Sequence, residues 1–167
     1  MFVHIALVGL NIRGHIRLGA SGKIITAFDM VRVMALGADW CNSARGFMFA
    51  LGCIQALRCH TGRCPTGVAT QDPVRQHALV VAEKANRVAS FHRETVLALA
   101  EVLAAAGLDH PAGLRPRHIS KRTAFGRAET YEQIYRFLKP GELLSGTDDP
   151  RFKDIWPRVR PDSFSVA

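Results

Sequence analysis

Three cysteines fall within twelve positions of this chain, and their spacing limits what it can fold into more than any other feature. They are Cys53, Cys59 and Cys64, with Pro65 after the last, in the pattern C-x5-C-x4-C-P. Nothing indicates secretion, and three clustered thiols leave one unpaired, so a disulfide framework is disfavoured. Zinc sites usually use pairs of cysteines with two to four residues between them. The spacing here does not supply such pairs, even with His60 as a fourth ligand.

Three thiolates on one loop, the last followed by proline, are typical of an iron–sulfur cluster. Three ligands favour a cluster that lacks one iron, unless a fourth ligand comes from elsewhere. A zinc site and three buried cysteines without metal stay open as alternatives. Cys41 lies in a different segment and is expected to be a small buried residue.

Length and composition place the chain among globular proteins. Its 167 residues suit about one domain, and 48% hydrophobic with 22% charged residues suits a packed core. No run of 18 uncharged apolar residues occurs, so we expect no membrane span, and the apolar start lacks the features of a signal peptide. We therefore expect a cytoplasmic protein. One helical face begins directly after Met1, without a capping residue, and comprises Phe2, Ile5, Ala6 and Gly9. We therefore interpret the N-terminus as a cut edge of a longer chain and not as a natural start.

Residues 15–55 predict two consecutive strand–loop–helix units. The first has a strand over 15–20, a loop over 21–23, and a helix that starts at Thr26 and stops at Gly37. The second has a strand over 38–42, a loop over 43–46, and a helix from Phe47 to Gln55 that leads into Cys53. A helix between the two strands implies that they pair in parallel.

Each loop offers what an anion site needs: backbone N–H groups, a helix N-terminus and one cation. The candidate ligands of a phosphate are Ser21, Gly22, Lys23, Ser43, Ala44 and Arg45. In a (β/α)8 barrel, the loops after the last two strands often form such a site. The alternative is a pair of ordinary connections with a solvated lysine and arginine.

The rest of the chain predicts helices, a basic run and an irregular tail. Residues 73–106 are helical in pattern with a break near 79–81, residues 128–138 can form one short helix, and Trp156 in the tail can pack back onto the body. The basic run comprises Arg115, Arg117, His118, Lys121, Arg122 and Arg127. A solvated surface is its simplest interpretation. Interdomain contact and nucleic-acid binding are the alternatives, although aromatics for base stacking are nearly absent there.

Three stretches of this sequence resemble the synthase domain of the FMN-binding glutamate synthase family. They are GASGKIITAFD, ALGADWCNSARGFMFALGCIQA and CHTGRCPTGVATQDP. The resemblance implies a (β/α)8 barrel that binds FMN and a 3Fe–4S cluster. It maps Cys53, Cys59 and Cys64 onto the cluster ligands and places both loops at the FMN phosphate. The activity it implies is formation of glutamate from 2-oxoglutarate and nitrogen from glutamine or ammonia, with hydride from reduced flavin and electrons relayed by the cluster.

The chain departs from that family in lacking the first part of the barrel and any glutaminase domain. A (β/α)8 barrel needs about 250 residues, and only two barrel strands are expected here. We therefore expect an α/β fold that is the C-terminal portion of a TIM barrel, about its last two βα units, with an iron–sulfur loop and C-terminal helices. Residues 1–72 are the expected partial barrel, and residues 73–167 a helical extension that packs on it.

The partners implied are the missing upstream half of the barrel, an electron-donor subunit or ferredoxin, and a glutaminase subunit. We expect no membrane partner and do not favour nucleic acid. The sequence names no catalytic acid or base, because the strands that would contact substrate are not recognisable in it. Two alternatives remain: a stand-alone iron–sulfur electron-transfer or metal-binding module, and an inactive truncated remnant.

Overall fold

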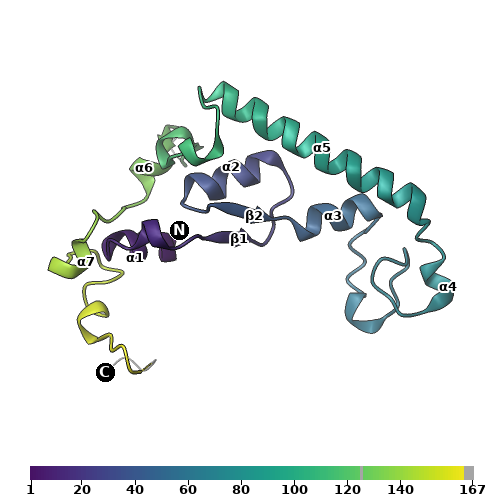
Figure 1. Cartoon of the computed structure of the whole chain (residues 1–167), viewed down its shortest axis with the longest axis horizontal. Coiled ribbons are helices and arrows are strands. Elements are labelled where there is room, and N and C mark those ends of the chain that lie inside the picture. The colour runs from purple at the N-terminus through teal and green to yellow at the C-terminus, as the bar shows by residue number, and fades with distance from the viewer. Residues whose placement is uncertain (125, 164–167) are drawn as a thin grey trace. The chain divides into compact units, whose positions relative to one another are not determined.

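Two short parallel strands, each followed by a helix, carry the two candidate phosphate loops (Figure 1). The computed structural model describes residues 1–124 and 126–163, so the last residues of the expected 73–167 extension lie outside it. The architecture is mixed α/β with few strands, and it divides into two compact units. The first unit contains residues 1–18, 35–39 and the described residues from 115 onward, and the second contains 19–34 and 40–114. The division at residue 73 stays a prediction.

The second unit holds the strand pair. Its elements are β1 (Gly19–Ser21), α2 (Ala27–Ala35, the last residue of which belongs to the first unit), β2 (Trp40–Asn42), α3 (Ala44–Leu51), a 3-10 turn at Cys59–Thr61, α4 (Pro73–Gln76), α5 (Val81–Ala105) and a 3-10 turn at Pro111–Gly113. The strands pair in parallel as predicted, in the register Gly19↔Trp40, Ala20↔Cys41 and Ser21↔Asn42. The predicted strand over 15–20 begins too early, because Arg13–His15 form a 3-10 turn and pairing starts at Gly19.

Local capping signals set the ends of α2 as predicted. The Asp29 carboxylate accepts hydrogen bonds from the N–H (3.0 Å) and hydroxyl (2.9 Å) of Thr26, and the Thr26 hydroxyl accepts one from the Asp29 N–H (3.2 Å). After the helix, Gly37 adopts φ +106°, a conformation that favours glycine.

α3 packs against the long helix α5. The ring of Phe47 meets that of Phe91 edge-on, with centroids 5.2 Å apart, and a Cβ added to Gly46 would lie 2.7 Å from Phe91 Cζ. The break predicted near 79–81 is present, because Val80 is extended and separates α4 from α5. The helix predicted from Phe47 to Gln55 is wrong at both ends. It begins at Ala44, so Ala44 and Arg45 of the predicted 43–46 loop are helical, and it ends at Leu51, where Gly52 takes φ +108°.

The first unit packs its C-terminal segment onto the N-terminal helix. Its elements are α1 (Phe2–Gly9), 3-10 turns at Arg13–His15, Pro116–His118 and Trp156–Arg158, β3 (Ser120–Arg122), β4 (Ala128–Thr130), α6 (Tyr131–Ile134) and α7 (Glu142–Ser145). Its buried core comprises Ile5, Leu138, Leu143 and Phe152. Trp156 packs against this core as predicted, and Phe2 stacks on Phe152 at 4.8 Å. Of the predicted helical face, Ile5 and Gly9 are buried and Ala6 packs against the core, whereas Phe2 remains 52% exposed.

The single helix predicted over 128–138 is wrong at both ends. Residues 128–130 instead form β4, which pairs antiparallel with β3 in the register Lys121↔Glu129. The helix begins only after Thr130, whose hydroxyl accepts from the Gln133 N–H at 3.3 Å while the Gln133 side chain accepts from the Thr130 N–H at 2.8 Å. α6 then ends at Ile134.

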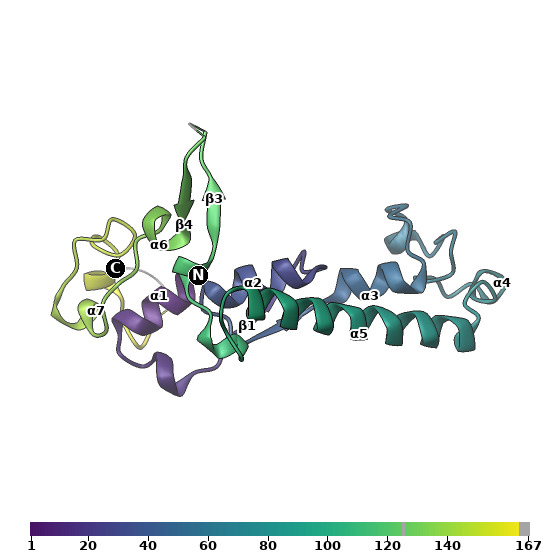
Figure 2. The same ribbon diagram turned by 90° about the horizontal axis from the view of Figure 1, so that it is seen from above.

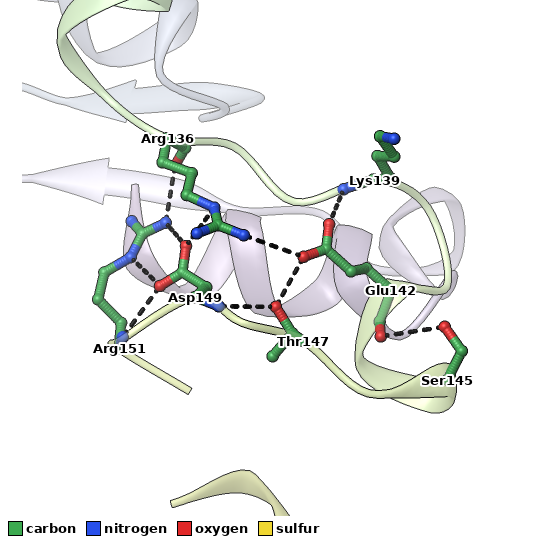
Figure 3. A network of polar contacts seen from close by, with 7 residues as sticks. All are labelled: Arg136, Lys139, Glu142, Ser145, Thr147, Asp149 and Arg151. Carbon is green, nitrogen blue, oxygen red and sulfur yellow. Dashed lines mark hydrogen bonds and ion pairs between the residues drawn. The ribbon is translucent and has the colours of Figure 1, made fainter. Parts of the chain in front are cut away.

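A buried carboxylate, Asp149, lies at the centre of a network of polar contacts in the C-terminal part of the first unit (Figure 3). Asp149 is fully buried and accepts hydrogen bonds from the backbone N–H and the guanidinium of Arg151, at 2.6–2.9 Å. Its backbone carbonyl accepts from the Phe152 N–H at 2.9 Å. The core and this polar network thus hold the same segment.

A second cluster of polar contacts in the first unit is centred on the cation Arg13. The Arg13 guanidinium donates to Asp39 Oδ2 (2.8 Å), the Gly37 carbonyl (2.8 Å) and His4 Nδ1 (3.0 Å). Asp39 Oδ2 also accepts from the Leu18 N–H (2.7 Å), and Leu18 and Asp39 directly precede β1 and β2. No helix within the described residues is long and apolar enough to cross a membrane.

Candidate functional site

A cavity of about 430 Å³ lies where the two strands of the second unit end. The loop after β1 contributes Ser21, Gly22 and Lys23, and the start of α3 contributes Ala44 and Arg45. Because parallel strands bring their carboxyl ends to one edge of a sheet, both loops reach this cavity. Five of the six predicted phosphate ligands therefore line one space.

The sixth predicted ligand, Ser43, is not among the lining residues of the cavity. Its hydroxyl donates instead to the Ile24 carbonyl at 2.7 Å and so ties the two loops together. Ser43 is the N-cap residue of α3, yet no side chain in the described part of the chain caps this helix. The first N–H groups of α3 are therefore available to an anion.

The two cations of the cavity are exposed and uncompensated. Among residues 1–124 and 126–163, no carboxylate forms an ion pair with Lys23 or Arg45. Lys23 holds φ +56°, an uncommon conformation for a residue with a side chain. Two free positive charges beside a helix N-terminus make the cavity electropositive.

Two of the three clustered cysteines line the same cavity. Cys53 and Cys59 belong to its wall, whereas Cys64 is buried outside it, with its sulfur 3.5 Å from the Thr66 hydroxyl. Within the described ranges, no three His, Cys, Asp or Glu side chains are grouped closely enough to hold a metal ion. The sulfurs are therefore not gathered into a ligating geometry, and the three-cysteine set stays a prediction.

The loop that carries these cysteines has few apolar contacts of its own. Gln55 and Leu57 both adopt positive φ, and the Leu57 side chain is 81% exposed. Thr70 Oγ1 donates to the Gly62 carbonyl, and the Gln76 side chain donates to the Thr70 carbonyl at 3.0 Å, so the second half of the loop is tied to α4. The first half, which holds Cys53 and Cys59, is held by local hydrogen bonds, such as those from the Cys53 N–H to the Met48 carbonyl at 2.9 Å and from the Thr61 N–H to the Arg58 carbonyl at 3.1 Å.

The environments of the cysteines differ. A hydrogen bond with the Thr66 side chain, supported by nearby backbone N–H groups, lowers the pKa of Cys64 to about 7. Cys41, which was expected to be buried, is only half-buried, and this burial alone raises its pKa above that of an ordinary thiol. Thiolate is the form that binds metal, so Cys64 is the better prepared ligand and Cys41 the poorer one.

The sequence left part of the cavity wall unassigned. The residues missed are Ile24, Asn42, Met48, Phe49, Gln55 and Leu57. Asn42 pairs in register with Ser21, so strand pairing was the signal for it. Met48 and Phe49 follow Arg45 by three and four residues, the helical spacing that places side chains on one face. Apolar side chains thus lie beside the cationic loops, as an amphipathic ligand with a phosphate requires.

Comparison with known proteins assigns the chain's first two thirds to one family. The family described as "conserved region in glutamate synthase" matches residues 1–109. These residues include both strands, both loops and all three clustered cysteines.

Individual relatives agree with this match. A glutamate synthase large subunit-like protein of Bacillus subtilis is 44% identical over 116 residues, which are 70% of this chain and 22% of the relative. An archaeal NADPH glutamate synthase of Methanocaldococcus jannaschii is 38% identical over 63% of this chain and 21% of the relative. The large chain of the NADPH glutamate synthase of Azospirillum brasilense is 34% identical over 93% of this chain. The chain thus spans about a fifth of the length of the first two relatives.

Proposed function

The chain belongs to the glutamate synthase family, and from this premise we propose that it is the flavin- and cluster-binding part of a glutamate synthase. The activity of the whole enzyme would be reductive formation of glutamate from 2-oxoglutarate and nitrogen from glutamine or ammonia. The observation that carries the proposal is the single cavity that both cationic loops share with Cys53 and Cys59. A site for a phosphate and a site for metal ligands meet there.

The cavity fits the phosphate end of FMN. The uncapped N–H groups of α3 would bind the phosphate oxygens, and Lys23 and Arg45 would neutralise their charge. Apolar Met48 and Phe49 would contact the rest of the ligand and exclude water from it. FMN, when bound, supplies hydride transfer.

The donor set fits an iron–sulfur cluster in its chemistry, with Cys53, Cys59 and Cys64 as the proposed ligands of a 3Fe–4S cluster. The first half of the loop would bring Cys53 and Cys59 toward Cys64, whose pKa near 7 favours the thiolate. The cluster, when bound, supplies one-electron transfer.

The fold and the partners extend this proposal. Two parallel strands joined through α2 are the repeating unit of a (β/α)8 barrel, and we propose that β1 and β2 are its last two strands. The remaining strands would come from the rest of the enzyme, in the same or a separate chain. Relatives are described as NADPH-dependent and ferredoxin-dependent, so either class of electron donor, together with a glutaminase part, is a proposed partner.

Iron content tests the cluster. The chain expressed with iron and sulfide, alongside the missing barrel half, is expected to be brown and to contain about three irons per chain. Cys53→Ser, Cys59→Ser and Cys64→Ser should each lose most of the iron, whereas Cys41→Ser, the matched control, should keep it. A colourless protein in which all four thiols titrate freely would contradict the proposal.

Flavin affinity tests the phosphate site independently of iron. We expect Lys23→Ala and Arg45→Ala each to weaken FMN binding about tenfold, because each removes a charge-assisted contact of about 1.5 kcal/mol. Riboflavin, which lacks the phosphate, should bind both variants as it binds the unchanged chain. Arg58→Ala, an exposed cation outside the cavity wall, is the control, and flavin fluorescence anisotropy is the measurement. Equal losses for FMN and riboflavin would place the phosphate elsewhere.

A further inference from the structure

The flavin and cluster chemistry proposed above does not involve the cations of the ribbon that β3 and β4 form. Between residues 110 and 128 the chain has five Arg or Lys residues and no Asp or Glu. Figure 2 shows the ribbon standing out from α6. The side chains of Arg117, Lys121, Arg122 and Arg127 are all exposed. This stretch carries much of the +8 net charge of the chain.

Several other cations of the same unit are neutralised by carboxylates, whereas within the part of the chain that the structure describes these four are not. Elsewhere in it, Arg13 pairs with Asp39, Arg151 with Asp149, and Arg160 with Asp162. No ion pair within residues 1–124 and 126–163 involves Arg117, Lys121, Arg122 or Arg127. Exposed, concentrated and unneutralised charge of one sign attracts a surface of the opposite sign.

We propose that the ribbon formed by residues 117–130 docks onto an acidic surface of another protein. Arginine suits that partner, because its planar guanidinium binds a carboxylate through two parallel hydrogen bonds. Arg122 and Arg127 are the central contacts, since Lys121 lies opposite the acidic residue Glu129 in the strand register. This inference does not depend on whether the chain binds FMN or a cluster.

The composition of the ribbon favours a protein over a nucleic acid. The Glu129 carboxylate sits in the middle of β4, where it would repel a continuous phosphate backbone, whereas a protein surface offers charges of both signs. The sequence has one aromatic residue between 115 and 130, Phe125, whereas base stacking along a strand uses several. Among residues 115–124 and 126–130, the exposed apolar side chains are alanines, and one phenylalanine beside them makes no apolar face for insertion into a lipid surface.

The position of the ribbon also favours a protein partner. It lies beyond residue 109, where the match to the conserved family region ends. The ribbon is therefore separate from the shared cofactor-binding region. The first relatives are about five times longer than their matched part, so an enzyme of this family presents ample further protein surface for such a contact.

A short acidic peptide tests the proposal on the full 167-residue chain. A fluorescein-labelled deca-glutamate is expected to bind, and binding should weaken as sodium chloride rises from about 50 to about 200 mM. The variant Arg122→Glu/Arg127→Glu should bind the peptide at least about tenfold more weakly. The variant Arg122→Lys/Arg127→Lys keeps both charges but loses the paired hydrogen bonds, so it should bind the peptide more weakly than the unchanged chain and more tightly than the reversal variant.

The matched control is Lys153→Glu/Arg158→Glu, which changes the net charge equally at two exposed positions of the same unit. It should leave peptide binding within about twofold. An equal loss in both reversal variants would mean that net charge alone acts, and would overturn the proposal, as would absence of peptide binding. Tighter ribbon-dependent binding to a decanucleotide or to phosphatidylserine vesicles would also overturn it. Far-UV circular dichroism checks folding, and Arg122→Gln/Arg127→Gln replaces a reversal variant that does not fold.

Discussion

Replacing Asp149 with Asn is expected to lower the free energy of unfolding of the first unit by about 3–5 kcal/mol, the usual cost of removing one partner from a buried ion pair. The Asp149 side chain is 0% exposed and accepts from Arg151 Nε at 2.9 Å and from its terminal nitrogen at 2.6 Å. Arg136 Nε lies 3.4 Å from the same carboxylate. Asparagine offers these cations one uncharged acceptor oxygen in place of a carboxylate, so Arg151 loses part of its paired contact and Arg136 keeps only Glu142, at 3.7 Å, as an ion-pair partner among the described residues (Figure 3).

The loss would reach the apolar core through the chain. Asp149 closes the turn whose next residues include Phe152, and the Phe152 ring is buried among Ile5, Leu138 and Leu143. Loosening the turn therefore weakens the packing of Phe152 against the core. The matched control is Asp148→Asn, an exposed neighbour whose removal should cost less than about 0.5 kcal/mol.

Trp156 provides the measurement, because it packs against this core. Denaturant unfolding followed by its fluorescence, in a Trp40→Phe background that leaves one indole, reports on the first unit. Comparable losses for Asp148→Asn and Asp149→Asn would show that the buried network contributes nothing beyond an ordinary surface charge.

The same residue gives a pH prediction with a defined sign. Hydrogen bonds from the Arg151 side chain lower the pKa of Asp149 from 3.8 to about 2. A carboxyl group whose pKa is lowered on folding stabilises the fold above its unfolded pKa and ceases to do so as pH falls through the folded value. About 2 kcal/mol should therefore be lost between pH 4 and pH 2 in the unchanged chain. Asp149→Asn should lack this share of the loss, as parallel unfolding curves at both pH values would show.

Local signals in the sequence predicted those element ends that local hydrogen bonds decide. Thr26 and Asp29 exchange the hydrogen bonds that start α2, and they lie within three positions of each other, so this helix start was predictable. The cap of α4, in which Asp72 accepts from the Val74 N–H, is equally local but was not among the predictions. The helix predicted through Gln55 failed because glycine at position 52 was not weighed as a stop.

Long-range pairing accounts for the other differences. Residues 128–130 have a helical pattern, yet they pair with 120–122, and nothing within the segment itself indicates that partner. In the candidate site, the loops after both strands were predictable because parallel strands place them at one edge. The hydrogen bond from the Ser43 hydroxyl to the Ile24 carbonyl was not predictable, because it depends on how the two loops meet in space.

Replacing Gly37 with alanine should have the second largest effect on the free energy of unfolding of the first unit. The sequence analysis assigned Gly37 only the role of ending α2, but the structure also leaves no space for a side chain there. An ideal Cβ would lie 2.2 Å from Cγ and 2.3 Å from Nδ1 of His4, and φ at Gly37 is +106°. Gly37→Ala must therefore displace the His4 ring, whose Nδ1 accepts from Arg13 Nε at 3.0 Å.

The expected cost of Gly37→Ala is about 2–5 kcal/mol, the sum of about 1–2 kcal/mol for a side chain at positive φ and about 1–3 kcal/mol for overpacking. Gly141→Ala separates the two contributions. Gly141 belongs to the same unit and has φ +77°, but nothing lies within 4 Å of its ideal Cβ, so only about 1–2 kcal/mol of conformational strain is expected. Trp156 fluorescence again follows unfolding.

A double variant identifies the contact responsible. His4→Ala removes the ring that the new methyl group would meet, at the cost of the hydrogen bond from Arg13. In the His4→Ala background, Gly37→Ala should cost about 1–2 kcal/mol, close to the value for Gly141→Ala, because only the strain of positive φ remains. If the costs of the two single substitutions add to within about 0.5 kcal/mol, the His4 ring is not what requires glycine at position 37, and backbone conformation alone does.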